Sequence, residues 1–200
     1  PRLIGAAHGI APDNVFKGAT LGTLLGVLAV TGMRVGEALA LDRNEVDLKR
    51  NLLTIRRAKG NKSRLVPLHP STSKALQEYA RLRDEVFPQP LNSCFFVWER
   101  GTRLLYCTVH RWFLLVACQM GLRQPGNPRG PRIHDLRHYF AIRTLLNWYR
   151  AGSDVEARLP ELATYLGHVH VRDSYWYLSA TPELLKLATL RLERAGKGER

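Results

Sequence analysis

Two short apolar segments joined by a turn constrain the fold of this chain more than any other feature. Residues 52–55 (LLTI) and 64–67 (RLVP) have the length of strands, and residues 59–62 (KGNK) between them are typical of a hairpin turn. The other patterned segments mostly have helical length. The sequence therefore predicts an α+β fold that is mostly α-helical with a small antiparallel β-sheet.

Glycine, proline and capping residues divide the rest of the chain into helices. Ser71 is expected to cap one helix, and Thr181 and Pro182 are expected to begin the last one. Residues 94–97 suit another short strand, and residues 124–131, which are rich in Pro and Gly, predict a loop. The helices before the last one are expected over residues 19–30, 35–41, 71–85, 108–120, 133–150 and 161–166.

The size of the chain fits one large domain. With 200 residues, 45% of them hydrophobic, the chain has enough apolar sequence to bury a core. Residues 1–16 are loosely patterned and are interpreted as the end of an interdomain linker, followed by a single domain over residues 17–200. The chain starts at Pro1 without an initiator Met, so we expect a fragment of a longer protein.

Positive charge is the strongest compositional signal. The formal net charge is +13 and the pI is about 10.2, which is most simply explained by a polyanionic partner. An acidic membrane surface is the competing partner. From residue 48 to 77, and again from 100 to 134, Lys and Arg occur without any Asp or Glu. We expect these stretches to follow DNA phosphates, with contacts from Arg56, Arg57, Lys62, Arg64, Arg103 and Arg132.

The apolar runs and the cysteines both favour a cytoplasmic protein. No uninterrupted apolar run is long enough to span a bilayer, and no segment has the form of a signal peptide. Cys94, Cys107 and Cys118 are widely spaced and form no paired motif for zinc or redox chemistry. We therefore expect reduced thiols and no association with a membrane.

Imidazole and guanidinium groups gather at the start of one predicted helix. His134, Arg137 and His138 lie at positions i, i+3 and i+4 and so share a face. Arginine can hold two non-bridging phosphate oxygens, and histidine can donate a hydrogen bond or move a proton near neutral pH. This set predicts a phosphodiester site. A polar helix start without function and a zinc site on the two histidines are the alternatives, although zinc is disfavoured because Arg137 lies on the same face.

Three further side chains have suggestive positions but are weak signals alone. His168 follows Gly167, and a glycine that ends a helix aims the next residue sharply. Arg34 lies at a helix junction between two glycines, where Glu37, one turn later, could orient it. Lys59 lies at the tip of the predicted hairpin, where lysines are normally solvated.

Taken in order along the chain, these segments resemble the catalytic domain of tyrosine recombinases, the phage-integrase superfamily of DNA strand-transfer enzymes. Residues 31–37 (TGMRVGE) look like the first arginine box, and residues 59–67 (KGNKSRLVP) resemble the hairpin that carries a lysine. Residues 134–138 (HDLRH) are similar to the His-x-x-Arg box, and residues 166–168 (LGH) match the third element. Tyr177 stands where the nucleophile of the family follows that histidine.

The resemblance implies a covalent mechanism. Tyr177 would attack a DNA phosphodiester, displace a 5′-hydroxyl and form a 3′-phosphotyrosyl bond, which stores the energy for rejoining without ATP. A phenol has a pKa near 10 and needs a base, so His134 is implied as that base or its assistant. Tyr175 and Tyr165 are the rival nucleophiles, and the spacing from His168 favours Tyr177.

The resemblance also implies how the phosphate is held. Arg34 and Arg137 would neutralise its non-bridging oxygens, and His168 would add a hydrogen bond. Lys59 would protonate the leaving 5′-oxygen, and His138 would support the site. The two guanidinium groups would take the place of a metal, so no metal and no other cofactor is expected.

The resemblance further implies double-stranded DNA as the partner and a homotetramer assembled on it. The resemblance also leads us to expect that the family's N-terminal DNA-clamping domain is absent from this chain. A type IB topoisomerase, which uses the same chemistry without strand exchange, and a non-catalytic DNA-binding module of the same fold are the alternative functions. A zinc hydrolase is a more distant alternative.

Overall fold

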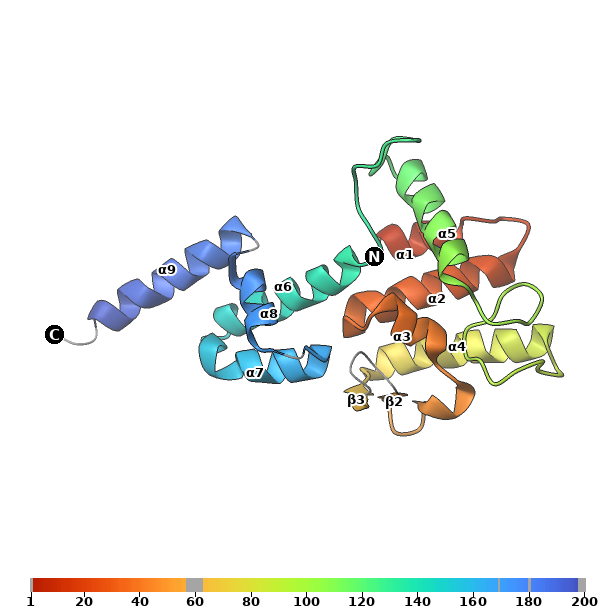
Figure 1. Ribbon diagram of the computed structural model, residues 1–200, viewed down its shortest axis with the longest axis horizontal. Coiled ribbons are helices and arrows are strands. Elements are labelled where there is room, and N and C mark those ends of the chain that lie inside the picture. The colour runs from red at the N-terminus through yellow and green to blue at the C-terminus, as the bar shows by residue number, and fades with distance from the viewer. Residues whose placement is uncertain (1, 57–62, 169, 180, 198–200) are drawn as a thin grey trace. The chain divides into compact units, whose positions relative to one another are not determined.

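The computed structural model describes residues 2–56, 63–168, 170–179 and 181–197, with the side chains of residues 179 and 191–197 left aside (Figure 1). The chain divides into two compact units, Pro1–Arg137 and His138–Arg200.

Helix α2 (Val15–Thr31) lies at the centre of the first unit. The side chain of Asn14 caps it by accepting a hydrogen bond from the Lys17 N–H, and Gly32 ends it in the left-handed conformation (φ 60°). Its leucines, such as Leu21 and Leu24, are fully buried. The other helices that begin in this unit are α1 (Arg2–His8), α3 (Val35–Ala40), α4 (Pro70–Val86), α5 (Tyr106–Gln119) and the start of α6 (Asp135–Arg150), and η1 (Arg43–Glu45) is a short 3-10 turn.

The N-terminal helix packs tightly on α2. A Cβ atom added at Gly18 would collide with the carbonyl oxygen of His8, and one added at Gly22 would collide with the His8 ring. Glycine is thus required where the two helices meet. Residues 1–16, expected as the end of a linker, therefore include a packed helix, while their place in a longer protein stays a prediction.

The β-sheet has three antiparallel strands in the order β1-β2-β3. They are β1 (Val46–Asp47), β2 (Leu52–Ile55) and β3 (Arg64–Pro67), with Leu53 opposite Val66. Leu53, Ile55 and Val66 are buried while Leu65 is exposed, as the alternation of a strand requires. The two predicted strands and their antiparallel pairing are confirmed, and the predicted turn at residues 59–62 lies outside the described residues.

Aromatic side chains fill the core beside the sheet. Tyr79 of α4 packs against Phe95, Phe96 and Phe16, with ring centroids 5.2–6.1 Å apart. Residues 94–97 form only isolated bridges, Asp42 with Cys94 and Val97 with Arg103, so the short strand predicted there is wrong. The segment is buried because its aromatic rings enter the core, and this burial does not require the continuous backbone hydrogen bonds of a strand.

The second unit has its own apolar core. The unit contains α7 (Val155–Leu166), α8 (Arg172–Tyr175), the 3-10 turn η2 (Trp176–Ser179), α9 (Pro182–Lys197) and most of α6. Their buried side chains form one cluster that includes Ala141, Leu145, Val155, Leu162, Leu166, Tyr177 and Leu184.

Most helices match the sequence prediction, and two details do not. Helix α7 begins at Val155, capped by Asp154, and carries Pro160 inside it, so the start predicted at residue 161 is too late. His69, not Ser71, caps α4, because its ring accepts the Ser71 N–H and Pro70 occupies the first helical position. Thr181 caps α9 as expected. Among the described helices none is long and apolar enough to cross a membrane.

Candidate active site

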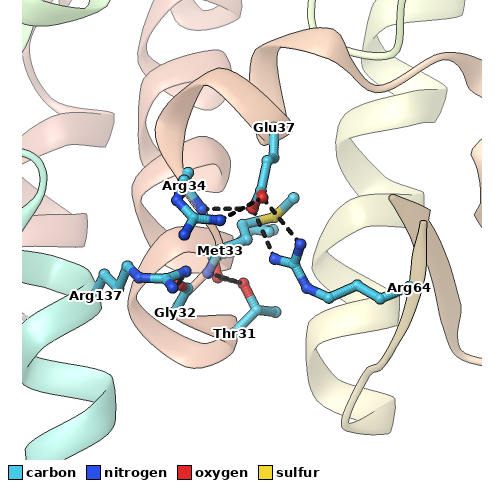
Figure 2. A network of polar contacts seen from close by, with 8 residues as sticks. Thr31, Gly32, Met33, Arg34, Glu37, Arg64 and Arg137 are labelled. Atoms are coloured by element: carbon cyan, nitrogen blue, oxygen red, sulfur yellow. Dashed lines mark hydrogen bonds and ion pairs between the residues drawn. The ribbon is translucent and has the colours of Figure 1, made fainter. Parts of the chain in front are cut away.

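The turn between α2 and α3 presents Arg34. Gly32 reverses the chain, and the Thr31 hydroxyl donates to the Val27 carbonyl at 2.6 Å and accepts the Met33 N–H at 3.4 Å. Met33 is buried, and Arg34 follows as the N-cap residue of α3 (Figure 2). The guanidinium group of Arg34 therefore projects from a backbone that is fixed on both sides.

One carboxylate, that of Glu37, holds two arginines. Its oxygens accept the Arg34 N–H at 2.8 Å and the Arg34 guanidinium at 3.1 Å. Arg64 of β3 donates through both terminal nitrogens, at 2.9 and 2.7 Å, in a bidentate pair (Figure 2). The side chain of Glu37 is 8% exposed and that of Arg64 is 12% exposed, so this pair is largely shielded from water.

The environment of Glu37 favours its charged form. Burial raises the pKa of this carboxyl group, but hydrogen bonds from Arg64 and from the Arg34 N–H, together with both positive charges, outweigh burial. The pKa of Glu37 is therefore lowered from its ordinary value of 4.5. The Glu37 carboxyl group therefore carries a negative charge at neutral pH and can pair with both guanidinium groups.

Arg137 reaches the same turn from the first part of α6. It is 2% exposed, and its Nη1 atom donates to the Gly32 carbonyl at 2.8 Å. The guanidinium groups of Arg34 and Arg137 thus lie at one turn, although more than one hundred residues separate them in the sequence (Figure 2). Within this network three guanidinium groups and one carboxylate leave an excess of positive charge, which suits an anion.

His134 lies just before α6 and is exposed. Its carbonyl oxygen accepts the Arg137 N–H at 3.0 Å. Asp135 accepts from the Arg132 N–H at 2.8 Å and from the Arg132 guanidinium at 3.3 Å. An exposed imidazole therefore lies at the start of α6, close in sequence to the buried Arg137.

In the second unit, His168 is fixed by its backbone and its ring. Gly167 ends α7 in the left-handed conformation (φ 69°), and the His168 N–H donates to the Ala163 carbonyl at 2.9 Å. Its Nδ1 atom lies 2.8 Å from the Ser174 hydroxyl oxygen. The ring also lies nearly parallel to that of Tyr177, with centroids 6.2 Å apart.

The three tyrosines near His168 differ in their surroundings. Tyr177 is 3% exposed and packs in the core of the second unit, with the His138 ring 5.6 Å from its own. Tyr175 is exposed, and Tyr165 is half-buried and stacks on Phe140. The Tyr177 ring lies against that of His168.

The remaining predicted residues differ in their placement. Arg56 is exposed and pairs with Glu45, while Arg103 donates to the Leu39 carbonyl and to Asp42. Lys59, Arg57 and Lys62 lie outside the described residues. Sequence reasoning missed Arg64 as a partner of Glu37 and Ser174 as a partner of His168, because no local pattern marks either contact. Within the described part of the chain, His, Cys, Asp and Glu form no group of three that could hold a metal ion.

The chain is similar to known proteins in sequence and in structure. A profile of the phage integrase family matches residues 6–183. The chain is 48% identical to integrase/recombinase y4rB of Sinorhizobium fredii, over 86% of this chain and 55% of that protein. The chain therefore spans little more than half the length of such relatives.

Solved structures show the same similarity. The crystal structure of XerA recombinase superposes with a TM-score of 0.71 at 30% identity and covers 92% of this chain and 59% of that one. The XerH site-specific recombinase, bound to a palindromic difH substrate in a post-cleavage complex, gives a TM-score of 0.69 at 25% identity, over 96% of this chain and 51% of that one.

We predict that Glu37→Gln destabilises the protein strongly. The variant leaves two guanidinium groups beside a neutral amide, and removing one partner of a buried ion pair costs about 3–5 kcal/mol. Chemical denaturation at neutral pH measures this loss. The matched control is Glu85→Gln, which breaks the exposed pair with Arg81 and should cost less than about 1 kcal/mol.

The effect of Glu37→Gln should also depend on pH. Because the pKa of Glu37 is lowered in the folded state, its contribution is fully present above its ordinary value of 4.5 and is lost as the pH falls through the folded value. The stability difference between the natural protein and the variant should therefore shrink in acid. A difference that stays constant down to low pH would contradict this assignment.

Proposed function

This chain belongs to the phage integrase family, and on that premise we propose that it breaks and rejoins DNA strands at specific sites through a 3′-phosphotyrosyl intermediate. The observation that carries the proposal is the convergence of Arg34 and Arg137 on one turn of the first unit. The partner is double-stranded DNA, on which the protein acts in the cytoplasm as a homotetramer. The tetramer rests on the family resemblance alone.

The proposed reaction transfers a phosphoryl group twice. The Tyr177 oxygen bonds to the phosphorus atom while the bond to the 5′-oxygen breaks. The phenol proton passes to His134 or to water that it orients, and Lys59 protonates the leaving 5′-oxygen. In the second step, a 5′-hydroxyl attacks the phosphotyrosyl bond and releases the tyrosine, so no external energy source is required.

Arg34 and Arg137 supply the electrostatic part of this mechanism. Negative charge on the non-bridging oxygens rises as the phosphorus becomes pentacoordinate. Donors that are already fixed, Arg34 by Glu37 and Arg137 by the Gly32 carbonyl, need little reorganisation to meet this charge. Each such donor contributes on the order of 3 kcal/mol to lowering the barrier. We propose that these guanidinium groups do the work of a metal ion in this reaction.

Support for Tyr177 as the nucleophile comes from the second unit. Its ring is held against His168 and within the apolar core, which limits the orientations of the phenol. Tyr175 lies two residues earlier in the neighbouring helix and is exposed. A fixed phenol beside an imidazole suits attack on one phosphate better than an exposed surface phenol does.

Three of the arginines expected to bind DNA fall into two groups. Arg132 is 72% exposed and Arg56 is exposed, so both are proposed to contact phosphates. Arg64 is shielded, with both terminal nitrogens on Glu37. We propose that Arg64 acts mainly by holding Glu37, which in turn holds Arg34.

The proposed nucleophile makes a direct prediction. With the complete protein and a library of nicked duplexes, including those that tile the DNA around its gene, a covalent protein–DNA adduct should form. Tyr177→Phe should abolish the adduct because the phenylalanine ring has no hydroxyl, whereas Tyr175→Phe should retain it. Gel mobility under denaturing conditions and mass spectrometry of the labelled peptide measure the result.

Two outcomes would contradict this assignment. An adduct that persists in Tyr177→Phe and vanishes in Tyr175→Phe would move the nucleophile to Tyr175. The complete absence of an adduct with every duplex would refute the proposed chemistry. Relaxation of supercoiled plasmid without exchange of strands would favour a topoisomerase instead.

The two groups of arginines can be separated by salt dependence. Log affinity falls as log salt concentration rises, and each phosphate contact adds about 0.9 to the magnitude of this slope, which is the quantity compared between variants. We expect Arg132→Ala to lower that slope by about this amount, and Arg64→Ala to leave it unchanged while slowing cleavage at saturating DNA. Fluorescence anisotropy from low to moderate salt measures the slope. A slope that falls equally in Arg64→Ala would show that Arg64 contacts the DNA backbone.

A further inference from the structure

Ser174 carries a buried hydroxyl group that the proposed reaction leaves without a role. Its side chain belongs to α8 and is 0% exposed, and its Oγ atom lies 2.8 Å from Nδ1 of His168. Ser174 lies between His168 and Tyr177 in the sequence, three residues before the tyrosine. A single short segment therefore connects the histidine, the hydroxyl group and the proposed nucleophile.

The contact has a chemical consequence for the imidazole. A neutral histidine carries a proton on one ring nitrogen and a lone pair on the other, and the partner of one nitrogen decides the state of the other. If the Ser174 hydroxyl donates to Nδ1, the ring proton lies on Nε2. If Nδ1–H donates to Ser174 instead, Nε2 becomes an acceptor.

A phosphate oxygen discriminates between these two forms. An anionic oxygen only accepts hydrogen bonds, so a neutral His168 stabilises it only when Nε2 carries the proton. The remaining geometry keeps the ring in place, because the His168 N–H is bonded to the Ala163 carbonyl and the ring face lies on Tyr177. The ring orientation is thus fixed, and the position of its proton is the variable that remains.

We propose that Ser174 is a positioning residue whose hydroxyl donates to Nδ1 of His168 and so keeps Nε2 protonated as a donor to an anionic phosphate oxygen. The identity of the anion rests on the proposed function. Ser174 touches neither substrate nor reacting atoms and acts only through His168. Its role differs from packing, since the hydroxyl group and not the volume of the side chain is what matters.

The first test reads the proton directly in the DNA-free protein. Nitrogen-15 NMR of the labelled imidazoles, with His168 assigned through the loss of its signals in His168→Gln, separates the two neutral forms. We expect the Nε2–H form in the natural protein and a mixture in Ser174→Ala. The matched control is Thr144→Ala, which removes a hydroxyl that donates to the Phe140 carbonyl at 3.0 Å in the same unit and should keep the natural form.

The natural protein alone is decisive in this measurement, even if a variant fails to fold. An Nδ1–H form in the natural protein would overturn the proposal. An unchanged spectrum in folded Ser174→Ala would overturn it as well, because the hydroxyl would then have no influence on the ring proton.

The second test separates a role through His168 from a role in packing. Ser174→Ala should slow adduct formation at saturating nicked duplex by about tenfold to one-hundredfold, as loss of an orienting partner commonly does. In the His168→Gln background the side-chain amide donates without any choice of proton position. There, Ser174→Ala should change the rate by less than about twofold, because both substitutions act through the same imidazole and their effects do not add.

The results of the second test lead to different conclusions. An equal loss of rate in both backgrounds would show that Ser174 supports packing and would overturn the proposal. A normal rate in Ser174→Ala with an altered NMR spectrum would overturn it too, since the proton position would not matter. A natural protein that forms no adduct would refute the proposed function, and the NMR spectrum would then decide the role of Ser174 by itself.

Discussion

The first unit depends on the carboxylate of Glu37, which binds Arg34 of the α2–α3 turn and Arg64 of the sheet. This one group therefore links a helix junction to a strand 27 residues later in the chain. Buried arginines need such a partner, since an uncompensated guanidinium group in a shielded place is costly. Arg137 donates to a backbone carbonyl in the same turn. The net result is a fixed and positively charged turn.

The two units support their proposed site residues by different means. In the first unit, ion pairs and a glycine turn hold the arginines in place. In the second unit, an apolar cluster holds Tyr177, and a hydroxyl group and a ring face hold His168. Charged groups suit an anion that must be neutralised, and an apolar cluster suits a nucleophile whose direction matters. Each kind of support thus fits the chemistry proposed for its residues.

Local signals explain most of what the sequence predicted. The strands at 52–55 and 64–67 follow from β-branched and apolar residues on either side of a predicted turn, and the Thr181-Pro182 cap follows from its chemistry. The start of α7 was missed because Pro160 lies inside the helix, and residues 94–97 are buried by aromatic packing that leaves no periodic pattern. The family motifs predicted Arg34, Arg137 and Tyr177 as site residues, and their roles stay predictions. The contacts of Arg64 with Glu37 and of Ser174 with His168 depend on tertiary placement, which no local pattern encodes.

The central claim is that Arg34 and Arg137 neutralise the charge of one phosphate. The most direct measurement compares cleavage of a phosphodiester with cleavage of a methylphosphonate, in which a methyl group replaces one non-bridging oxygen and removes the negative charge. Arg34→Ala should slow cleavage of the phosphodiester by about one-hundredfold to one-thousandfold. The same variant should cleave the uncharged methylphosphonate at nearly the rate of the natural protein. An equal loss on both substrates would contradict the claim, because Arg34 would then act through something other than the phosphate charge.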